Sequence, residues 1–150
     1  MIKSIWIFVL SFLGIFIIDQ NIKHLFINGF SYYGNCISLI LTYNRGVAFS
    51  LFAFLGENLK YIQLLLISLV VIYMVFHKKT FTKYSLPLGI ILGAGSSNIY
   101  DRFIYGGVVD YVYWHCGFNF AIFNFADVMI DFGVLMILYL NFKNKKYERG

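Results

Sequence analysis

Four long apolar stretches alternate with more polar segments along the chain. They cover about residues 5–25, 59–76, 86–102 and 124–142. A helix needs roughly 20 apolar residues to cross a hydrocarbon layer of about 30 Å. No small-x-small cleavage site follows the first stretch, so we expect it to be a retained helix. The pattern therefore predicts an all-α membrane protein, a bundle of four transmembrane helices that forms a single domain over residues 1–150.

Two of the connecting segments combine polar, aromatic and β-branched residues. The first, 26–58, contains β-branched and aromatic residues over 37–54, interrupted at Asn44-Arg45-Gly46, which is typical of a turn within extended structure. It predicts a small sheet on the membrane surface. The second, 103–123, is dense in aromatic side chains, which collect at the level of the lipid headgroups.

The distribution of charge predicts how the helices are oriented. Only 13% of the residues are charged, against roughly a quarter in soluble domains, and 60% are hydrophobic. The net charge of +5 does not indicate nucleic acid binding, because most basic residues lie at the ends of the apolar stretches. Positive residues favour the cytoplasmic side. We therefore expect both termini in the cytoplasm, together with the connector around 78–83. Eight basic residues support this orientation: Lys3, Lys78, Lys79, Lys83, Lys143, Lys145, Lys146 and Arg149.

Several acidic residues lie in or beside the apolar stretches, where a charged group is energetically costly. A carboxylate at the centre of a bilayer costs at least about 2.5–3.5 kcal/mol, and less near an interface. Five of the seven acidic residues lie in or beside apolar stretches: Asp19, Asp101, Asp110, Asp127 and Asp131.

Helical spacing gathers these acids at one end of the bundle. Asp127 and Asp131 share a helical face with Asn124, so this face should point into the protein. The third apolar stretch carries a second polar face at the same outer end, formed by Asn98, Asp101 and Arg102. Asp110 follows Gly106-Gly107 and is expected to lie in irregular structure between these two helices.

Asp110 and Asp127 are the candidate catalytic pair. Two neighbouring carboxyl groups share one proton, because like charges a few ångströms apart cannot both ionise. One carboxylate can then activate water while the other donates a proton, which is the chemistry of an aspartic peptidase. His115 and Cys116 are too few ligands for a zinc site, so we expect neither a metal nor another cofactor.

Other functions and roles remain open at this stage. Buried aspartates also serve as relays in proton or ion pathways, although here they cluster at one membrane face. A non-enzymatic scaffold would leave them without a purpose. Asp131 is expected to be structural, for example pairing with a lysine or lining a wet pocket, and Asp101 to support Arg102. Cys36 and Cys116 are interpreted as small apolar residues, with a bridge in an oxidising compartment as the alternative.

The polar motifs resemble those of the lipoprotein signal peptidase family, signal peptidase II, over nearly the whole chain. Each motif lies at a predicted outer membrane boundary. Ser97 and Val47 stand where the family usually has glycine and alanine. The motifs are Asp19-Gln20-x-x-Lys23, Asn44-x-Gly46-x-Ala48-Phe49, Asn98-x-x-Asp101-Arg102, Gly107-Val108-Val109-Asp110, and Phe123-Asn124-x-Ala126-Asp127 with Gly133.

The resemblance implies a function and a set of site residues. The catalytic pair corresponds to Asp110 and Asp127, and the substrate-binding or supporting residues are Asp19, Lys23, Asn44, Asn98, Arg102 and Asn124. The implied enzyme removes signal peptides from diacylglyceryl-modified prolipoproteins, cleaving just before the lipidated cysteine.

The same resemblance implies where the protein works and with what architecture. It implies four spans with an outer β-cradle between the first two, and a location in the bacterial inner membrane with the active site near the periplasmic face. The lipid bilayer and prolipoproteins are the expected partners. We expect a monomer that binds no nucleic acid.

Overall fold

The structure is a computed structural model that describes residues 1–46 and 53–147. The end of the Asn44-x-Gly46-x-Ala48-Phe49 motif, with Val47, lies outside the described residues. The long helices are α1 (Ile2–Ile27), α2 (Asn58–Phe76), α3 (Lys78–Tyr105) and α4 (Phe125–Tyr147), with a short 3-10 turn, η2 (Ala53–Leu55). The strands are β1 (Tyr32–Tyr33), β2 (Ile37–Asn44) and β3 (Val108–Trp114).

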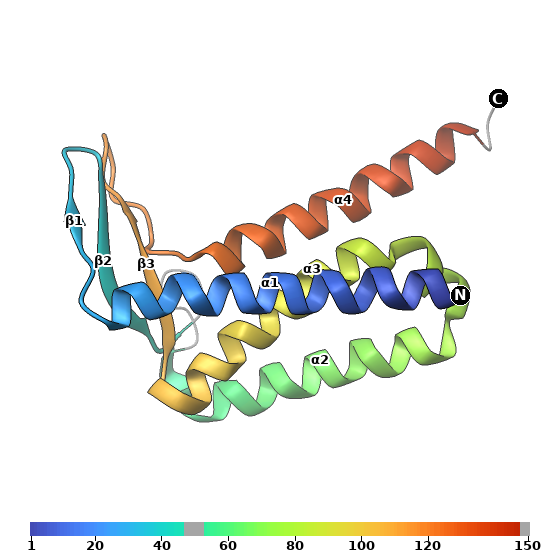
Figure 1. The fold of residues 1–150 in the computed structure, drawn as a ribbon, viewed down its shortest axis with the longest axis horizontal. Coiled ribbons are helices and arrows are strands. Elements are labelled where there is room, and N and C mark those ends of the chain that lie inside the picture. Colours follow the sequence, from blue (N-terminus) through green and yellow to red (C-terminus); the bar gives the residue numbers. More distant parts are fainter. Residues whose placement is uncertain (47–52, 148–150) are drawn as a thin grey trace.

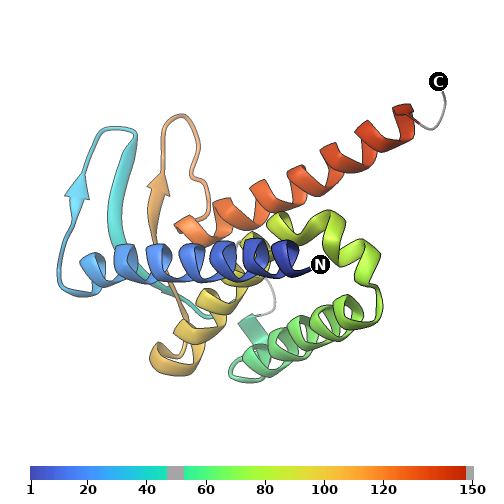
Figure 2. The ribbon, with the colours of Figure 1, turned by 45° about the vertical axis from the view of Figure 1, so that its right-hand side comes forward.

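The helices run side by side, and the sheet lies across one end of them (Figure 1). The start of α1 and the end of α4 both lie at the other end of the bundle. Figure 2 shows the same separation after rotation, with the strands beside the end of α1 and the start of α4. One end of the molecule is therefore mixed in structure, and the other is purely helical.

Among the described residues, three helices are long and apolar enough to cross a membrane, namely α1, α2 and α4. The fourth predicted span and the cytoplasmic position of the termini remain predictions. Helix α3 begins at Lys78, earlier than the expected start at residue 86, so the basic connector is itself helical. The backbone leaves helical geometry at Tyr84, three residues before Pro87, whose ring clashes with the preceding turn and lacks an N–H donor.

The distribution of buried residues is the reverse of that in a soluble protein. Large apolar side chains cover the outside of α2, on which only Leu59 and Met74 are buried. The fully buried side chains include Lys23, Asp19 and Asn124. This distribution suits a surrounding lipid phase, in which apolar groups face outward and polar groups pair inside the bundle.

Small residues bring α3 into close contact with α1. A Cβ atom added at Gly89 would lie 2.6 Å from the carbonyl oxygen of Phe8, and one at Gly93 would lie 2.5 Å from that of Phe12. Because those contacts are with backbone, side chains at these glycines would push the two helices apart. This agrees with the general use of small residues at helix contacts in membranes.

The sheet differs from the expected one in the origin of its third strand. Its order is β1-β2-β3, both pairings are antiparallel, and Thr42 faces Asp110 across the β2–β3 pair. The expectation that Asp110 lies in irregular structure was therefore wrong, as was a sheet confined to the segment between the first two spans. Gly106, with φ of 71°, ends α3 and lets the chain turn into β3, where pairing with β2 satisfies its backbone groups.

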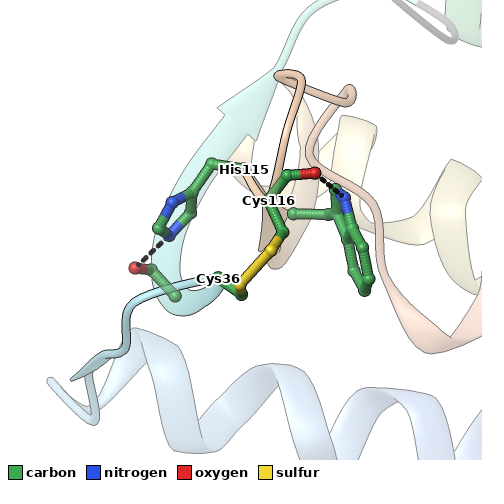
Figure 3. The surroundings of a disulfide bond; sticks show 5 residues. Cys36, His115 and Cys116 are labelled. Carbon is green, nitrogen blue, oxygen red and sulfur yellow. Dashed lines mark hydrogen bonds between the residues drawn. A yellow bond between two sulfur atoms is a disulfide. The ribbon is translucent and has the colours of Figure 1, made fainter.

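The two cysteines form a disulfide across this sheet (Figure 3). Cys36 directly precedes β2 and Cys116 lies two residues after β3. Our interpretation of both as small apolar residues was wrong, because the β2–β3 pairing brings their positions together although they are 80 residues apart in sequence.

Candidate active site

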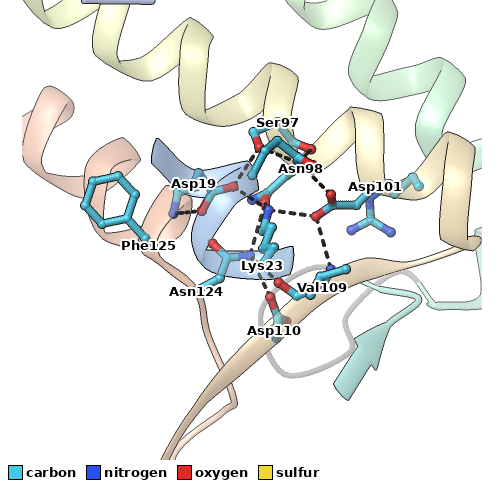
Figure 4. Close-up of polar contacts among 12 residues, drawn as sticks. Asp19, Lys23, Ser97, Asn98, Asp101, Val109, Asp110, Asn124 and Phe125 are labelled. Atoms are coloured by element: carbon cyan, nitrogen blue, oxygen red, sulfur yellow. Dashed lines mark hydrogen bonds and ion pairs between the residues drawn. The ribbon is translucent and has the colours of Figure 1, made fainter. Parts of the chain in front are cut away.

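Lys23 lies fully buried near the end of α1, among acidic side chains (Figure 4). Its Nζ atom is 2.6 Å from Asp19 Oδ2 and 2.6 Å from Asp101 Oδ2, and it donates to Asn98 Oδ1 at 2.8 Å. Each of the three donors of the ammonium group therefore has an acceptor. The predicted Asp19–Lys23 pair is confirmed and extends into a buried ionic cluster of Asp19, Lys23 and Asp101.

Neutral polar groups complete this ionic cluster and connect it to other elements. Ser97 Oγ donates to Asp19 Oδ2 at 2.6 Å, and Gln20 Nε2 donates to Asp101 Oδ1 at 2.8 Å. The backbone N–H of Val109 donates to Asp101 Oδ2 at 3.1 Å. The cluster therefore joins α1, α3 and β3 in one hydrogen-bonded unit.

The first turn of α4 is held by side chains from three parts of the chain. The N–H of Phe125 donates to Tyr111 Oη at 3.0 Å, and that of Ala126 to Asp19 Oδ1 at 3.0 Å. Asn124 and Asp127 bind each other's backbone N–H, at 2.9 and 3.1 Å, as in a capping box. These contacts satisfy N–H groups that a helix leaves open and fix the position of Asp127.

Asp110 and Asp127 come together through asparagine side chains. Asp110 accepts hydrogen bonds from Asn124 Nδ2 at 2.8 Å and from Asn44 Nδ2 at 3.0 Å. Asp127 accepts one from Asn98 Nδ2 at 2.9 Å. Asn124 Nδ2 also lies 3.0 Å from Asn98 Oδ1, so one amide connects both carboxyl groups to the same network. Within the described part of the chain, neither carboxylate forms an ion pair.

The environment of Asp110 favours its neutral form. The side chain lies in β3 and only 2% of its surface is exposed. Burial, followed by the nearby charge of Asp127, raises the pKa of Asp110 to about 7, and the amide donors of Asn44 and Asn124 oppose this shift. Near neutral pH this group can therefore hold or release a proton.

Arg102 points at the backbone between β2 and η2 and not at Asp101. It donates to the carbonyl oxygens of Asn44, at 3.4 Å, and of Gly46. The Asp101 carboxylate binds Lys23 and Gln20 directly, so any support that it gives to Arg102 comes from the charge of the nearby carboxylate and not from a direct ion pair among the described residues. Arg102 instead holds the end of β2, from which Asn44 reaches Asp110.

A cavity of about 510 Å³ opens beside the two carboxyl groups. Asp110, Asp127 and Arg102 line it, together with the segment after β3 at residues 120–123. Asp131 also lines it, as expected for a residue in a polar pocket. Within the described chain, no group of three or more His, Cys, Asp or Glu residues could hold a metal ion.

The structure brings together all eight site residues predicted from the sequence, and it adds others. Asp19 and Lys23 lie in the ionic cluster, and Asn44, Asn98, Arg102 and Asn124 surround the carboxyl pair. The sequence assigned no role to Gln20, Ser97, Tyr111 or Gln63. Gln20 and Ser97 adjoin motif residues, which was a usable signal, whereas the contact between Tyr111 and α4 arises from the path of β3.

The fold is that of a bacterial membrane enzyme. One such enzyme, solved by the in meso method at 2.3 Å resolution, has a TM-score of 0.73 at 21% identity, with 95% of this chain and 89% of that chain covered. A second, solved at 1.9 Å, has a TM-score of 0.68 at 20% identity, with 91% and 90% covered.

The sequence comparisons identify the family. The family model described as Signal peptidase (SPase) II matches residues 11–143. The lipoprotein signal peptidase of Sulfurimonas denitrificans is 61% identical over 96% of this chain and 93% of its own length. That of Wolinella succinogenes is 51% identical, with 96% of each chain covered. The chain belongs to the signal peptidase II family. This membership does not favour the alternative function of an ion pathway.

Proposed function

We propose that this chain removes the signal peptide from diacylglyceryl-modified prolipoproteins, and that it does so as an aspartic endopeptidase. The observation that carries the catalytic assignment is the bridge that Asn124 makes between Asp110 and the network around Asp127. It holds two carboxyl groups beside one cavity in a protein whose relatives are lipoprotein signal peptidases. Cleavage falls just before the lipidated cysteine.

In the proposed mechanism Asp127 is the base and Asp110 the acid. Asp127 lies in the first turn of α4, where the helix dipole favours negative charge, and it accepts two N–H donors. Burial keeps Asp110 protonated up to about pH 7. Asp127 takes a proton from water as its oxygen attacks the scissile carbonyl, and Asp110 gives its proton to the carbonyl oxygen.

Collapse of the resulting tetrahedral diol completes the reaction. The C–N bond breaks, Asp127 passes its proton to the leaving amine, and a hydroxyl of the diol returns a proton to Asp110. No acyl-enzyme forms, and both carboxyl groups end in their starting protonation states. Asn44, Asn98 and Asn124 orient the pair, while Arg102 holds the chain after β2 against the cavity.

We further propose that the sheet end faces the periplasm and that four spans place both termini in the cytoplasm. The disulfide supports this orientation, because such bonds persist in oxidising compartments and are rare in the cytoplasm. Basic residues at the opposite end support it too. We also propose that the protein is a monomer with a single domain.

Replacing either carboxyl group by an amide tests the assignment. We expect Asp110→Asn and Asp127→Asn to lower cleavage of a lipidated prolipoprotein by at least about 10²–10⁴-fold, because each removes a proton-transfer group. A gel-shift assay in detergent measures this. Glu57→Gln, which changes an exposed carboxyl group outside the cavity, is the matched control and should retain full activity. Substantial activity in either aspartate variant would overturn the catalytic assignment.

A further inference from the structure

The catalytic cavity has a second polar region that the mechanism does not use. Gln63, from α2, and Asp131, from α4, both line the cavity. Asp131 lies one helical turn, about 6 Å, further from the sheet than Asp127. Gln63 likewise lies more than one turn inside α2, which begins at Asn58 beside the sheet end. We call Gln63 and Asp131 the inner polar pair.

The two residues of the inner polar pair bring acceptor oxygens to the cavity. Gln63 Oε1 is buried and has no hydrogen-bond partner among the described residues. Asp131 is exposed and forms no ion pair with any described side chain, and it lies within a helix that is apolar enough to span a membrane, where lipid tails offer no donors. A buried acceptor without a donor, such as Gln63 Oε1, is uncommon in folded proteins and destabilises them, and a carboxylate within a span is costly as well. A ligand that supplies N–H or O–H groups would remove this deficit.

The need for donors distinguishes between the two parts of the proposed substrate. A diacylglyceryl thioether offers ester oxygens and sulfur, which accept hydrogen bonds but do not donate them. A peptide in extended conformation offers a backbone N–H at every residue except proline. The peptide part of the substrate therefore matches the inner polar pair, and the lipid part does not.

The position of the pair indicates which peptide residues it contacts. In the proposed orientation, the signal peptide reaches the carboxyl pair from the membrane, so residues before the scissile bond lie further inside the bundle. A strand rises about 3.3 Å per residue, so a 6 Å displacement corresponds to roughly two residues. We propose that Gln63 and Asp131 accept hydrogen bonds from backbone N–H groups of the signal peptide, within about two residues before the scissile bond.

This inference rests on the proposed peptidase function, and its test uses synthetic diacylglyceryl peptides. In each peptide, an ester replaces one amide among the two bonds that precede the scissile bond, which removes a single N–H donor. The scissile amide stays intact. We expect wild type to lose about tenfold in kcat/KM on the peptide that lacks the contacted N–H. The all-amide peptide gives the reference rate.

Variants of the inner polar pair link this loss to particular side chains. Gln63→Leu and Asp131→Leu each remove one acceptor side chain and should lower kcat/KM on the all-amide peptide by about tenfold. Each variant should show little further loss on the ester peptide that lacks the N–H which its missing side chain would have bound. Gln63→Glu keeps an acceptor oxygen and should retain the preference for the amide. Ser68→Ala is the matched control, because Ser68 is an exposed residue of α2 whose hydroxyl donates to the carbonyl oxygen of Leu64 in the same helix.

The outcomes separate this inference from the proposed function. If wild type cleaves the all-amide peptide but both leucine variants match it, the inner polar pair does not bind substrate. If the leucine variants lose the same factor in kcat/KM on the amide and ester peptides, water or a membrane lipid occupies this region, and the inference is again overturned. If wild type cleaves none of the lipidated peptides, the proposed function itself is wrong. Size-exclusion chromatography and circular dichroism verify that each variant is folded.

Discussion

Two groups of aspartates lie within the same end of the bundle, and they are held in different ways. Asp19 and Asp101 share the ammonium group of Lys23 at 2.6 Å each. Asp110 and Asp127 are held by amide groups and have no cation in contact within the described chain. The first arrangement gives both carboxyl groups a cation as partner and joins α1 to α3. The second leaves carboxyl groups that can exchange a proton beside a cavity, which is what the proposed chemistry needs.

Removal of the cation should have the largest effect on the protein. Lys23→Met leaves two buried carboxylates without their partner and should destabilise the protein by about 3–5 kcal/mol. Activity should be lost together with the fold. Thermal unfolding in detergent, followed by circular dichroism, measures the change.

The matched control is Lys60→Met, because Lys60 pairs with Glu57, which is highly exposed. Such surface pairs contribute only about 0–1 kcal/mol. The aspartate variants should behave in the opposite way, keeping the thermal stability of wild type while losing activity. Loss of activity in a Lys23→Met protein as stable as wild type would contradict the division into structural and reactive acids.

The disulfide gives the next largest effect, because it fixes the sheet that carries Asp110. Cys36→Ser should lower stability by about 2–4 kcal/mol, since removing a cross-link frees the unfolded chain. Treatment of wild type with dithiothreitol should reproduce the effect, and the same reagent should leave Cys36→Ser unchanged. Thermal unfolding with and without reductant tests this. A reductant effect of equal size in the variant would exclude the disulfide as its source.

The pH dependence of cleavage should report on the proton held by Asp110. The pKa of Asp110 is raised to about 7, so its carboxyl group is protonated below that pH and loses its proton above it. Because the proposed acid must be protonated, kcat/KM should fall about tenfold per pH unit above this midpoint.

Asn44 provides an internal check on that midpoint. Its amide donor lowers the pKa of Asp110, so Asn44→Ala should move the alkaline limb to higher pH. Any overall loss of rate would be a separate effect, because it would lower the whole profile of kcat/KM against pH without moving its alkaline limb. A limb that stays in place or moves to lower pH would indicate that another group controls it.

The smallest expected effect concerns the cap of α4. Tyr111→Phe removes the hydroxyl that accepts the N–H of Phe125 and should lower stability by about 0.5–1.5 kcal/mol, the range for one hydrogen bond. The ring keeps its stacked contact with Phe26, at 4.2 Å between centroids, so packing is preserved. A loss above about 3 kcal/mol would exceed what one hydrogen bond contributes and would point to a wider disruption.

Local patterns were enough to predict much of the helical part. Apolar length located the helices, although α3 begins earlier than expected because its first turns are basic. Spacing of three and four residues placed Asn124 with Asp127, and Asp19 with Lys23. Contacts that depend on distant segments were missed, among them the disulfide and the partner of Asp101. Gln63 was missed too, because one polar residue in an apolar helix has no spacing that reveals its partner.

By itself, the sequence determined that the chain is a membrane-type helical protein with its polar residues gathered at one end. These properties follow from hydropathy and helical periodicity, which act over neighbouring residues. The packing of distant elements places Asp110 on a strand, brings Lys23 into contact with two acids, and surrounds the carboxyl pair with asparagines. The reason is physical: in a low-dielectric interior, a charged or polar group pairs with whatever partner the packing of distant elements supplies.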